Sequence, residues 1–137
     1  MSEPIVYIDR SRIRPGKLHG LKKAIDELVE FIEAREPQLL CYGFHLDEEA
    51  SRMTVVAVHP DPASVELHME VGASAFSRFG EFIELDAIEV YGETSDRMLD
   101  QLQKTAEMLG DHGRVTVQPL RAGFSRLGTE MAHRRVT

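Results

Sequence analysis

The stretch from Met53 to Phe82 most constrains the fold, because it passes from a buried strand directly into a helix. Residues 53–58 are apolar and rich in β-branched side chains, which is typical of a strand covered on both faces. Asp61 before Pro62 predicts a helix start, since the carboxylate can accept from free N–H groups of the first turn and proline suits the first helical position. In the helix that follows, His68 falls on the apolar stripe. The pattern therefore predicts an imidazole that points toward the core.

Two strands and a helix are predicted before this stretch. Residues 5–8 form a short apolar run that predicts a strand, and residues 11–16 form a polar turn that ends in proline and glycine. Beyond the turn, apolar residues recur every three or four positions from Leu18 to Ile32, which predicts an amphipathic helix. Residues 39–46 alternate as in a strand, and the charged connection at 47–52 indicates a hairpin into the buried strand.

A fourth strand is predicted from Ile83 to Tyr91, with a change of parity inside it. The apolar residues up to Ala87 share one parity, whereas Ile88 and Val90 take the other, and such a slip is typical of a β-bulge. The order of elements is then strand, helix, strand, strand, helix, strand. This order predicts an α+β protein with the ferredoxin-like βαββαβ fold, in which two helices pack on one face of an antiparallel sheet.

The C-terminal third of the chain extends this arrangement. Its apolar spacing predicts a third helix from Thr94 to Leu109 and a short strand from Arg114 to Gln118. We therefore expect residues 1–93 to form the ferredoxin-like domain and residues 94–127 to add a helix and a strand to the same domain. Residues 128–137 hold few apolar side chains, which predicts a mobile tail.

The apolar strands also indicate a partner. At least two of them are apolar on both faces, yet two helices can cover only one face of the sheet. A large exposed apolar face would favour aggregation, so we expect it to be buried between two copies of the chain. The sequence thus predicts a homodimer whose sheets pack face to face.

Charge and composition exclude other classes of partner. The net charge is −7, and the region from Asp26 to Asp111 holds 20 acidic residues against 5 basic ones, which disfavours nucleic acid. No apolar run is long enough to span a bilayer, and the N-terminus lacks the pattern of a signal peptide. A single cysteine, Cys41, leaves no internal disulfide. We therefore expect a cytoplasmic protein that binds neither a membrane nor nucleic acid.

Several of these segments together resemble a known family. They are the N-terminal strand from Pro4 to Ile8, the Pro15-Gly16 turn into a helix, and the helix sequence SVELHMEVGASAFSRF with its histidine and phenylalanines. Over roughly residues 4 to 93 the chain is similar to the antibiotic biosynthesis monooxygenases of the dimeric α/β-barrel superfamily. The histidine of that family's helix motif corresponds to His68, and its later aromatic residue to Phe76 or Phe79.

The resemblance implies a dimer with a ligand cavity in each subunit between helices and sheet. Members of the family oxidise polycyclic phenols without a cofactor, degrade haem or act on quinols, and many have no assigned reaction. This chain has no tryptophan, whereas the haem-degrading and polyketide-oxidising branches use one in the pocket. We therefore expect a small aromatic or quinone-like ligand, with no cofactor, and do not transfer the residue roles of either branch.

His68 is the predicted catalytic base, because an imidazole with a pKa near 6.5 can accept a phenolic proton at neutral pH. Removing that proton gives an anion that can pass an electron to oxygen in a dry cavity. The competing interpretation is a histidine that only makes hydrogen bonds inside the core. The residues predicted to contact the ligand come from two strands and the second helix: Tyr7, Tyr42, His45, Phe76 and Phe79.

Two alternatives to an oxygenase remain open. The protein can be a dimer that binds a small ligand without any reaction, or a haem-binding or haem-degrading protein with His68 or His45 as the axial ligand. No metal site is predicted, since neither His59 nor His68 has a partner at the spacing that places two ligands together.

Overall fold

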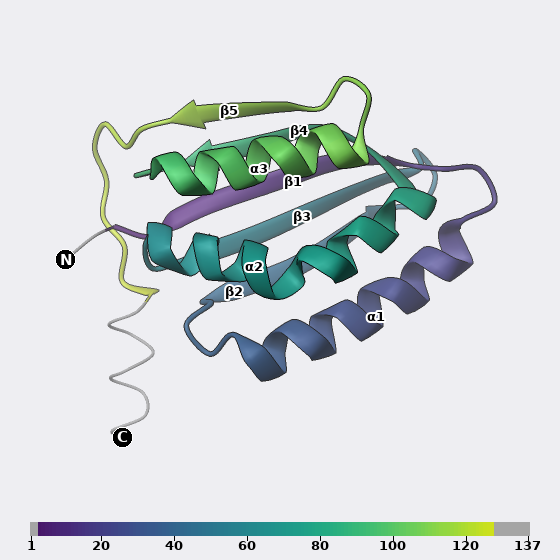
Figure 1. Ribbon diagram of the computed structural model, residues 1–137, viewed down its shortest axis with the longest axis horizontal. Helices are drawn as coiled ribbons and strands as arrows, with labels where there is room; N and C mark the ends of the chain where they lie inside the picture. Colours follow the sequence, from purple (N-terminus) through teal and green to yellow (C-terminus); the bar gives the residue numbers. More distant parts are fainter. Residues whose placement is uncertain (1–2, 128–137) are drawn as a thin grey trace.

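The segments with strand and helix periodicities fold in the predicted order. The computed structural model describes residues 3–127, and Figure 1 shows the three helices lying side by side over one sheet. The elements along the chain are β1 (Ile5–Ile13), α1 (Leu18–Arg35), β2 (Cys41–Asp47), β3 (Arg52–His59), α2 (Pro62–Arg78), the short 3-10 helix η1 (Phe79–Glu81), β4 (Ile83–Tyr91), α3 (Asp96–Leu109) and β5 (Arg114–Gln118). The tail predicted at 128–137 lies outside the described residues.

The sheet has the predicted ferredoxin-like topology with one strand added. Its order is β2-β3-β1-β4-β5. β1 runs antiparallel to both β3 and β4, and β2 runs antiparallel to β3. β5 extends the sheet as a parallel neighbour of β4. The predicted α+β class is therefore confirmed, and α3 with β5 enlarges the same sheet.

The sequence signal at the start of α2 acts as predicted, and a similar cap begins α3. The Asp61 carboxylate accepts a hydrogen bond from the Ser64 backbone N–H at 2.9 Å, and Pro62 takes the first position of α2. At α3, the Ser95 hydroxyl accepts from the Met98 backbone N–H at 3.1 Å. These caps fix where α2 and α3 begin and therefore which of their side chains face the sheet.

The predicted bulge is present where β4 pairs with β1. Their register shifts between Arg10 and Ser11, opposite the step from Ala87 to Leu85. Leu85 and Ile88 are consequently both buried although their positions have opposite parity. The bulge thus lets all of β4 contribute apolar side chains to the layer beneath the helices.

The predicted turn at residues 11–16 begins too early. Residues 11–13 continue β1, with Ser11 buried on the helix side and Arg12 exposed on the other face. Arg12 forms ion pairs with Glu84 and Asp86 on β4, at 2.5 and 3.1 Å. Ser11 and Arg12 are therefore adjacent strand residues on opposite faces of the sheet, and only Arg12 lies on the solvent side.

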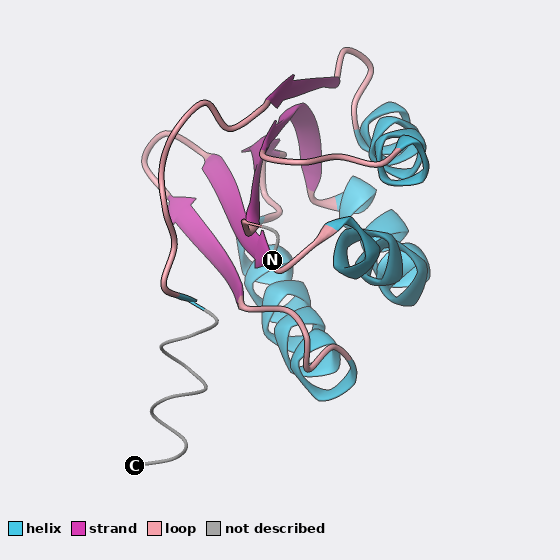
Figure 2. Ribbon diagram, turned by 90° about the vertical axis from the view of Figure 1, so that its left-hand side faces the viewer, coloured by secondary structure: helices cyan, strands magenta, loops and turns pink. Residues whose placement is uncertain are grey.

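The helices cover only one face of the sheet, and Figure 2 shows all of them on the same side. The strand alternation places Val6, Ile8 and Val56 on the opposite face, where each is partly exposed. Arg10 and Glu89 form an ion pair on that face at 3.1 Å. None of the helices within residues 3–127 is long and apolar enough to cross a membrane.

Candidate functional site

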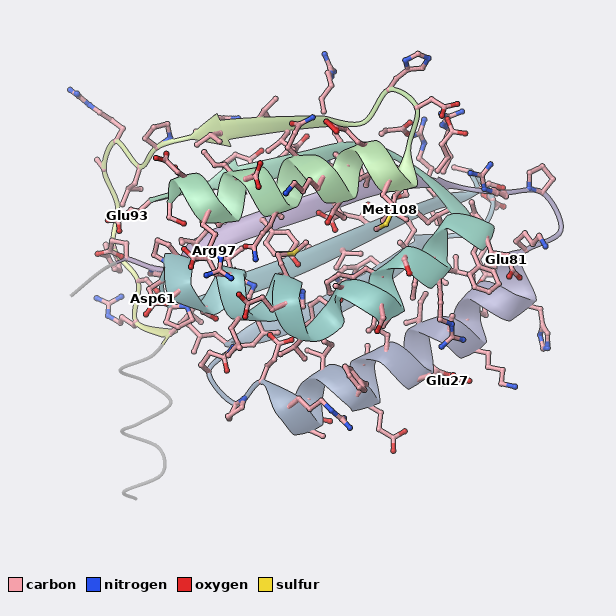
Figure 3. The ribbon with its side chains drawn as sticks, in the orientation of Figure 1. Glu27, Asp61, Glu81, Glu93, Arg97 and Met108 are labelled. Atoms are coloured by element: carbon pink, nitrogen blue, oxygen red, sulfur yellow. The ribbon has the colours of Figure 1, made fainter. Side chains whose placement is uncertain are left out.

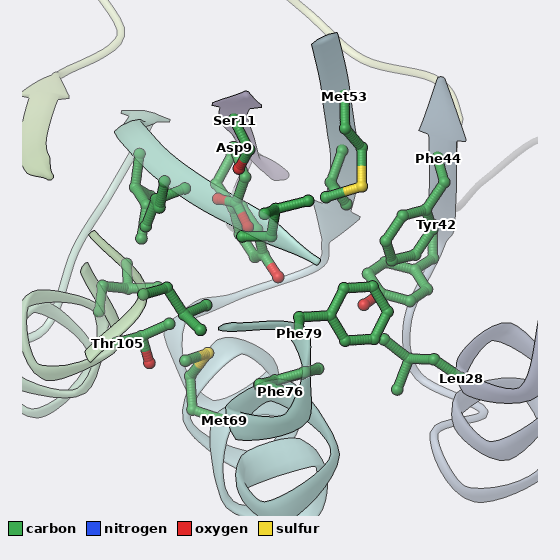
Figure 4. A pocket seen from close by; sticks show the side chains of 17 residues that line it. Asp9, Ser11, Leu28, Tyr42, Phe44, Met53, Met69, Phe76, Phe79 and Thr105 are labelled. Atoms are coloured by element: carbon green, nitrogen blue, oxygen red, sulfur yellow. The ribbon is translucent and has the colours of Figure 1, made fainter. Parts of the chain in front are cut away.

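A cavity lies between the sheet and the helices. Its volume is about 50 Å³, which gives room for roughly three water molecules. Most of its wall is aliphatic or aromatic, from all three helices, η1 and strands β1 to β4. In Figure 4, Asp9 and Ser11 of β1 lie across the cavity from Met69 and Phe76 of α2. The polar residues of the lining are Tyr7, Asp9, Ser11, Tyr42 and Thr105.

Two polar side chains of β1 have no partner in this wall. Asp9 Oδ1 and Ser11 Oγ are both buried and make no hydrogen bond within the described part of the chain. Buried polar atoms are normally satisfied, because an unpaired one costs about 1–3 kcal/mol or more. A carboxyl and a hydroxyl therefore face the cavity with free hydrogen-bonding capacity.

The cavity shifts the acid–base properties of its lining. Burial raises the pKa of Asp9 from 3.8 to about 7, with no opposing cation. Burial, followed by the negative charge of Asp9, raises the pKa of Tyr7 and Tyr42 well above 10. The two phenols are thus neutral hydrogen-bonding groups, whereas Asp9 changes its charge near neutral pH.

His68 points into the core, as predicted, and pairs with a buried carboxylate. Its Nδ1 lies 2.9 Å from both carboxylate oxygens of Glu36, and both side chains are fully buried. Glu36 is the residue that follows α1, so the pair joins the end of α1 to α2. The other ring nitrogen, Nε2, is buried without a partner among the described residues. Glu36 therefore orients the ring and leaves Nε2 as its free nitrogen.

Aromatic side chains separate His68 from the cavity. The ring centroids of Phe76 and Tyr42 lie 5.0 and 5.1 Å from that of His68, and that of Tyr7 lies 6.1 Å away. All three line the cavity, whereas His68 does not. The predicted base is thus one aromatic layer behind the cavity wall.

A second buried histidine supports this layer. His59 stacks on Tyr7 with ring centroids 5.6 Å apart, and its Nδ1 lies 2.7 Å from Ser64 Oγ. Burial, with a smaller effect of His68, lowers the pKa of His59 from 6.5 to about 3. His59 is consequently neutral at physiological pH and packs as a core residue.

The residues predicted to contact a ligand separate into two groups. Tyr7, Tyr42, Phe76 and Phe79 line the cavity together. His45 lies on the opposite face of the sheet, where it is exposed, because its parity on β2 differs from that of Tyr42. Neither histidine predicted as an axial haem ligand lines the cavity, since His45 lies on the other face and His68 lies behind the aromatic side chains.

Two residues of the site were not predicted. Asp9 was missed because the first strand was predicted to end at Ile8, although continued alternation from Tyr7 would have placed the carboxyl on the same face. Glu36 was missed because nothing in the local sequence distinguishes it from the acidic residues of α1 that face solvent. Its contact with His68 joins positions 32 residues apart.

Two external grooves lie beside α2. The groove between α2 and α3 has a volume of about 230 Å³ and shares Met69, Phe76 and Thr105 with the cavity. The groove between α1 and α2 has a volume of about 340 Å³ and shares Leu28 and Phe79 with it. The same side chains that close the cavity therefore form the floors of both grooves.

Polar contacts join α2 and α3 away from their groove. The Ser95 hydroxyl donates to Glu66 Oε2 at 2.6 Å, and Arg97 forms an ion pair with Glu70. Figure 3 shows Arg97 reaching from the first half of α3 toward α2, whereas Met108 lies near the other end of α3. The helices are thus tied together near the start of α3, and the groove opens near its end.

No set of side chains in residues 3–127 is suited to a metal ion. Within that range, no three His, Cys, Asp or Glu side chains come together in an arrangement that could hold one. The lining of the cavity contains a single carboxylate and no histidine or cysteine. The polar groups that the lining offers are the carboxyl of Asp9, the phenols of Tyr7 and Tyr42, and the hydroxyls of Ser11 and Thr105.

Comparisons with solved structures identify the fold. MupZ from Pseudomonas fluorescens is 20% identical and has a TM-score of 0.70, over 92% of this chain and 97% of MupZ. A structure named antibiotic biosynthesis monooxygenase is 21% identical with a TM-score of 0.53, over 63% of this chain and 92% of that one. PA3566 from Pseudomonas aeruginosa is 26% identical with a TM-score of 0.52, over 66% and 91% of the two chains. No protein-family model and no curated protein matches the sequence.

These similarities confirm the fold that the resemblance predicted. The chain has the fold of the antibiotic biosynthesis monooxygenase structures, at sequence identities that establish the fold alone. The similarity to MupZ reaches further along the chain, since 92% of its length cannot be covered without the region of α3 and β5. The C-terminal helix and strand are therefore part of an architecture found in another protein.

Proposed function

We propose that this chain binds a small aromatic or quinone-like compound in the cavity beneath α2 and oxidises it with molecular oxygen, without a cofactor. The observation that carries the proposal is the convergence of Tyr7, Asp9 and Tyr42 on a cavity that is otherwise apolar. An apolar enclosure with a few polar groups is the usual form of a small-ligand site. The fold shared with the antibiotic biosynthesis monooxygenase structures supports the same class of function.

Ligand entry requires movement, because a cavity of about 50 Å³ is smaller than the ~300–1,000 Å³ of typical ligand sites. Phe76 is the side chain best placed to move. It lines the cavity, forms the floor of the groove between α2 and α3, and packs against His68. Rotation of Phe76 into the groove would enlarge the cavity, open it toward solvent and remove one of the aromatic side chains that separate the cavity from His68.

In this proposal His68 is the base that prepares the ligand for oxygen. Glu36 holds Nδ1, so that Nε2 is the nitrogen available to accept a phenolic proton once Phe76 has moved. The resulting phenolate gives an electron to oxygen more readily than the neutral phenol does. The surrounding apolar wall keeps water away from the oxidised intermediate.

The proposed assembly is a homodimer formed through the open face of the sheet. That face carries partly exposed apolar side chains from β1 and β3, and no helix within residues 3–127 covers it. Two copies related by a two-fold axis would place these side chains against each other.

Binding and oxygen uptake test the proposal together. We expect 2-naphthol to bind in calorimetric titrations, and 1,4-naphthohydroquinone to consume oxygen faster with the protein than by autoxidation alone. The His68→Gln variant should still bind 2-naphthol but lose at least tenfold in oxygen uptake, since general base catalysis contributes about 10²–10⁴-fold. Equal oxygen uptake by the variant and the wild type would contradict the role of His68.

A second candidate function is ligand binding without a reaction. The observation that favours it is the complete burial of His68 behind Phe76 and the tyrosines. Binding of 2-naphthol without any protein-dependent oxygen uptake would support this candidate over the oxygenase.

A further inference from the structure

The carboxyl of Asp9 is the one charged group that the described chain places in the cavity wall. Its neighbours in the lining are aliphatic, aromatic or uncharged polar side chains. Asp9 takes part in no ion pair among residues 3–127, and its Oδ1 has no hydrogen-bond partner there. A carboxylate that has no cation beside it, and whose Oδ1 is buried without a donor, is costly to the folded chain. Such a group is more readily explained by a ligand than by stability.

We propose that Asp9 recognises the polar group of the bound ligand, and that the site takes uncharged ligands bearing a hydroxyl or a carbonyl in preference to carboxylates. This inference rests on the proposed function and adds the group that orients its ligand. A ligand carboxylate would meet the negative charge of Asp9 with no arginine, lysine or histidine in the lining to offset it. A neutral aromatic ring would instead gain contacts with Phe76, Phe79 and Met69 on the opposite wall.

The charge state of Asp9 decides which polar group it can bind. As a carboxylate it only accepts hydrogen bonds and therefore binds a ligand hydroxyl, which in a quinol is a different hydroxyl from the one that gives its proton to His68. When protonated it also donates, and can therefore bind a carbonyl oxygen. Because burial places the pKa of Asp9 at about 7, both forms are present near neutral pH. The same side chain can thus hold a phenolic ligand and a quinone-like one.

The other titratable groups around Asp9 do not produce the same pH dependence. Tyr7 on β1 and Tyr42 on β2 have pKa values raised well above 10, and they remain neutral. The residues that α1, α2, α3 and β4 contribute to the lining are not titratable. Behind Tyr7, His59 is neutral above a pKa of about 3. The remaining titratable residues are His68 and Glu36, which lie behind Phe76. The His68→Gln variant separates their effect on the pH dependence of binding from that of Asp9.

The test compares three naphthalene probes of nearly equal size. By calorimetric titration of the full chain between pH 5.5 and 8.5, 2-naphthol should bind about tenfold more tightly at the higher pH, because its hydroxyl gains a charged acceptor. The affinity for 2-acetylnaphthalene should change in the opposite direction. The affinity for 2-naphthoate should remain at least tenfold below that for 2-naphthol at pH 8.5.

Substitution of Asp9 should remove these differences. We expect Asp9→Asn to bind 2-naphthol with an affinity that does not change between pH 5.5 and 8.5. Its discrimination against 2-naphthoate should also fall. Asp26→Asn, which alters an exposed carboxylate on α1, should behave as the wild type, and His68→Gln should keep the pH dependence. Near-ultraviolet circular dichroism of each variant checks that the fold is retained.

The outcomes separate this inference from the proposed function. Unchanged pH dependence in Asp9→Asn, or its loss in His68→Gln, would overturn the inference while leaving ligand binding in place. Failure of the wild type to bind any of the uncharged probes would overturn both. Binding that depends on Asp9 but is accompanied by no oxygen uptake would support the inference and contradict only the oxidation.

Discussion

Glu36 and His68 meet inside the core, where Nδ1 of the imidazole lies 2.9 Å from both carboxylate oxygens and neither side chain is exposed. Glu36 directly follows α1, and His68 lies within α2. The pair therefore fixes the separation of the two helices as well as the orientation of the ring. A buried pair of this kind makes the fold sensitive to the loss of either partner.

Replacing Glu36 should destabilise the fold in proportion to the hydrogen bonding that is lost. We expect Glu36→Ala to lower the free energy of unfolding by about 3–5 kcal/mol, because the imidazole is left buried and unpaired. Glu36→Gln keeps an acceptor for Nδ1–H and should lose only about 1 kcal/mol. Urea denaturation at pH 7 measures both, with exposed Glu33→Gln on α1 as the control. A loss below about 1 kcal/mol in Glu36→Ala would show that the pair contributes little to stability.

The inward position of His68 could be predicted from the sequence, but its contact with Glu36 could not. The spacing along α2 was enough to place His68 inside, since helix periodicity is a local property. Its partner is 32 residues away, and only the packed structure brings the two together. By contrast, the bulge in β4 and the cap at Asp61 were predictable, because each leaves its signal within a few adjacent residues.

The positions of residues along the strands determine which face of the sheet each side chain occupies. His45 and Tyr42 were both proposed as ligand contacts, although an odd separation along a strand places two side chains on opposite faces. The structure obeys that rule and puts His45 outside. The same rule would have placed Asp9 beside Tyr7 if the first strand had been extended past Ile8. The fold was thus more predictable than the site, which depends on strand ends and long-range contacts.

Stability should depend on pH through Asp9. Its pKa is raised from 3.8 to about 7 on folding, so the folded state holds a proton that the unfolded chain releases between these values. The contribution of Asp9 to the free energy of unfolding should therefore fall as pH rises from 4 to 7, by up to about 4 kcal/mol. Asp9→Asn removes this loss. In urea denaturation, the free energy of unfolding of the variant relative to that of the wild type should therefore be higher at pH 8 than at pH 4.5. If the two proteins differed in free energy of unfolding by the same amount at both pH values, Asp9 would not titrate in this range.

His59 should act in the opposite direction on the acid side. Its pKa is lowered from 6.5 to about 3 by burial, so the unfolded chain binds a proton that the folded chain excludes. The resulting stability is present above pH 6.5 and falls as the pH decreases, by about 3 kcal/mol at pH 4.5. His59→Asn can still bond to Ser64 and removes this contribution. Denaturation at pH 7 and pH 4.5 should show that the difference in free energy of unfolding between the wild type and the variant is smaller at pH 4.5.

A charge on the open face of the sheet should disrupt the proposed dimer. Ile8 is partly exposed there, on the central strand β1. We expect Ile8→Asp to sediment as a monomer at concentrations where the wild type sediments as a dimer, because an unpaired carboxylate would be buried at the interface. Glu107→Gln on α3 alters an exposed position on the other side of the molecule and should leave the sedimentation unchanged. A monomeric wild type would contradict the proposed assembly directly.

Gly72 should prove essential for the position of Phe76, the side chain that closes the cavity. A Cβ at Gly72 would overlap the Phe76 ring, which folds back over the glycine within α2. Alanine normally stabilises a helix interior by about 1 kcal/mol relative to glycine. Here we expect Gly72→Ala to destabilise the protein by about 1–3 kcal/mol, since the ring must leave its place.

A double substitution separates this effect from a general loss of helix packing. In a Phe76→Leu background the overlap is reduced, so Gly72→Ala should cost less than it does in the wild type. Ser74→Ala, on the exposed side of α2, should leave the free energy of unfolding within about 0.5 kcal/mol of the wild type. Because displacing the ring also opens the cavity toward the groove between α2 and α3, Gly72→Ala should bind 2-naphthol faster in stopped-flow measurements. An unchanged association rate would mean that Phe76 does not control entry to the cavity.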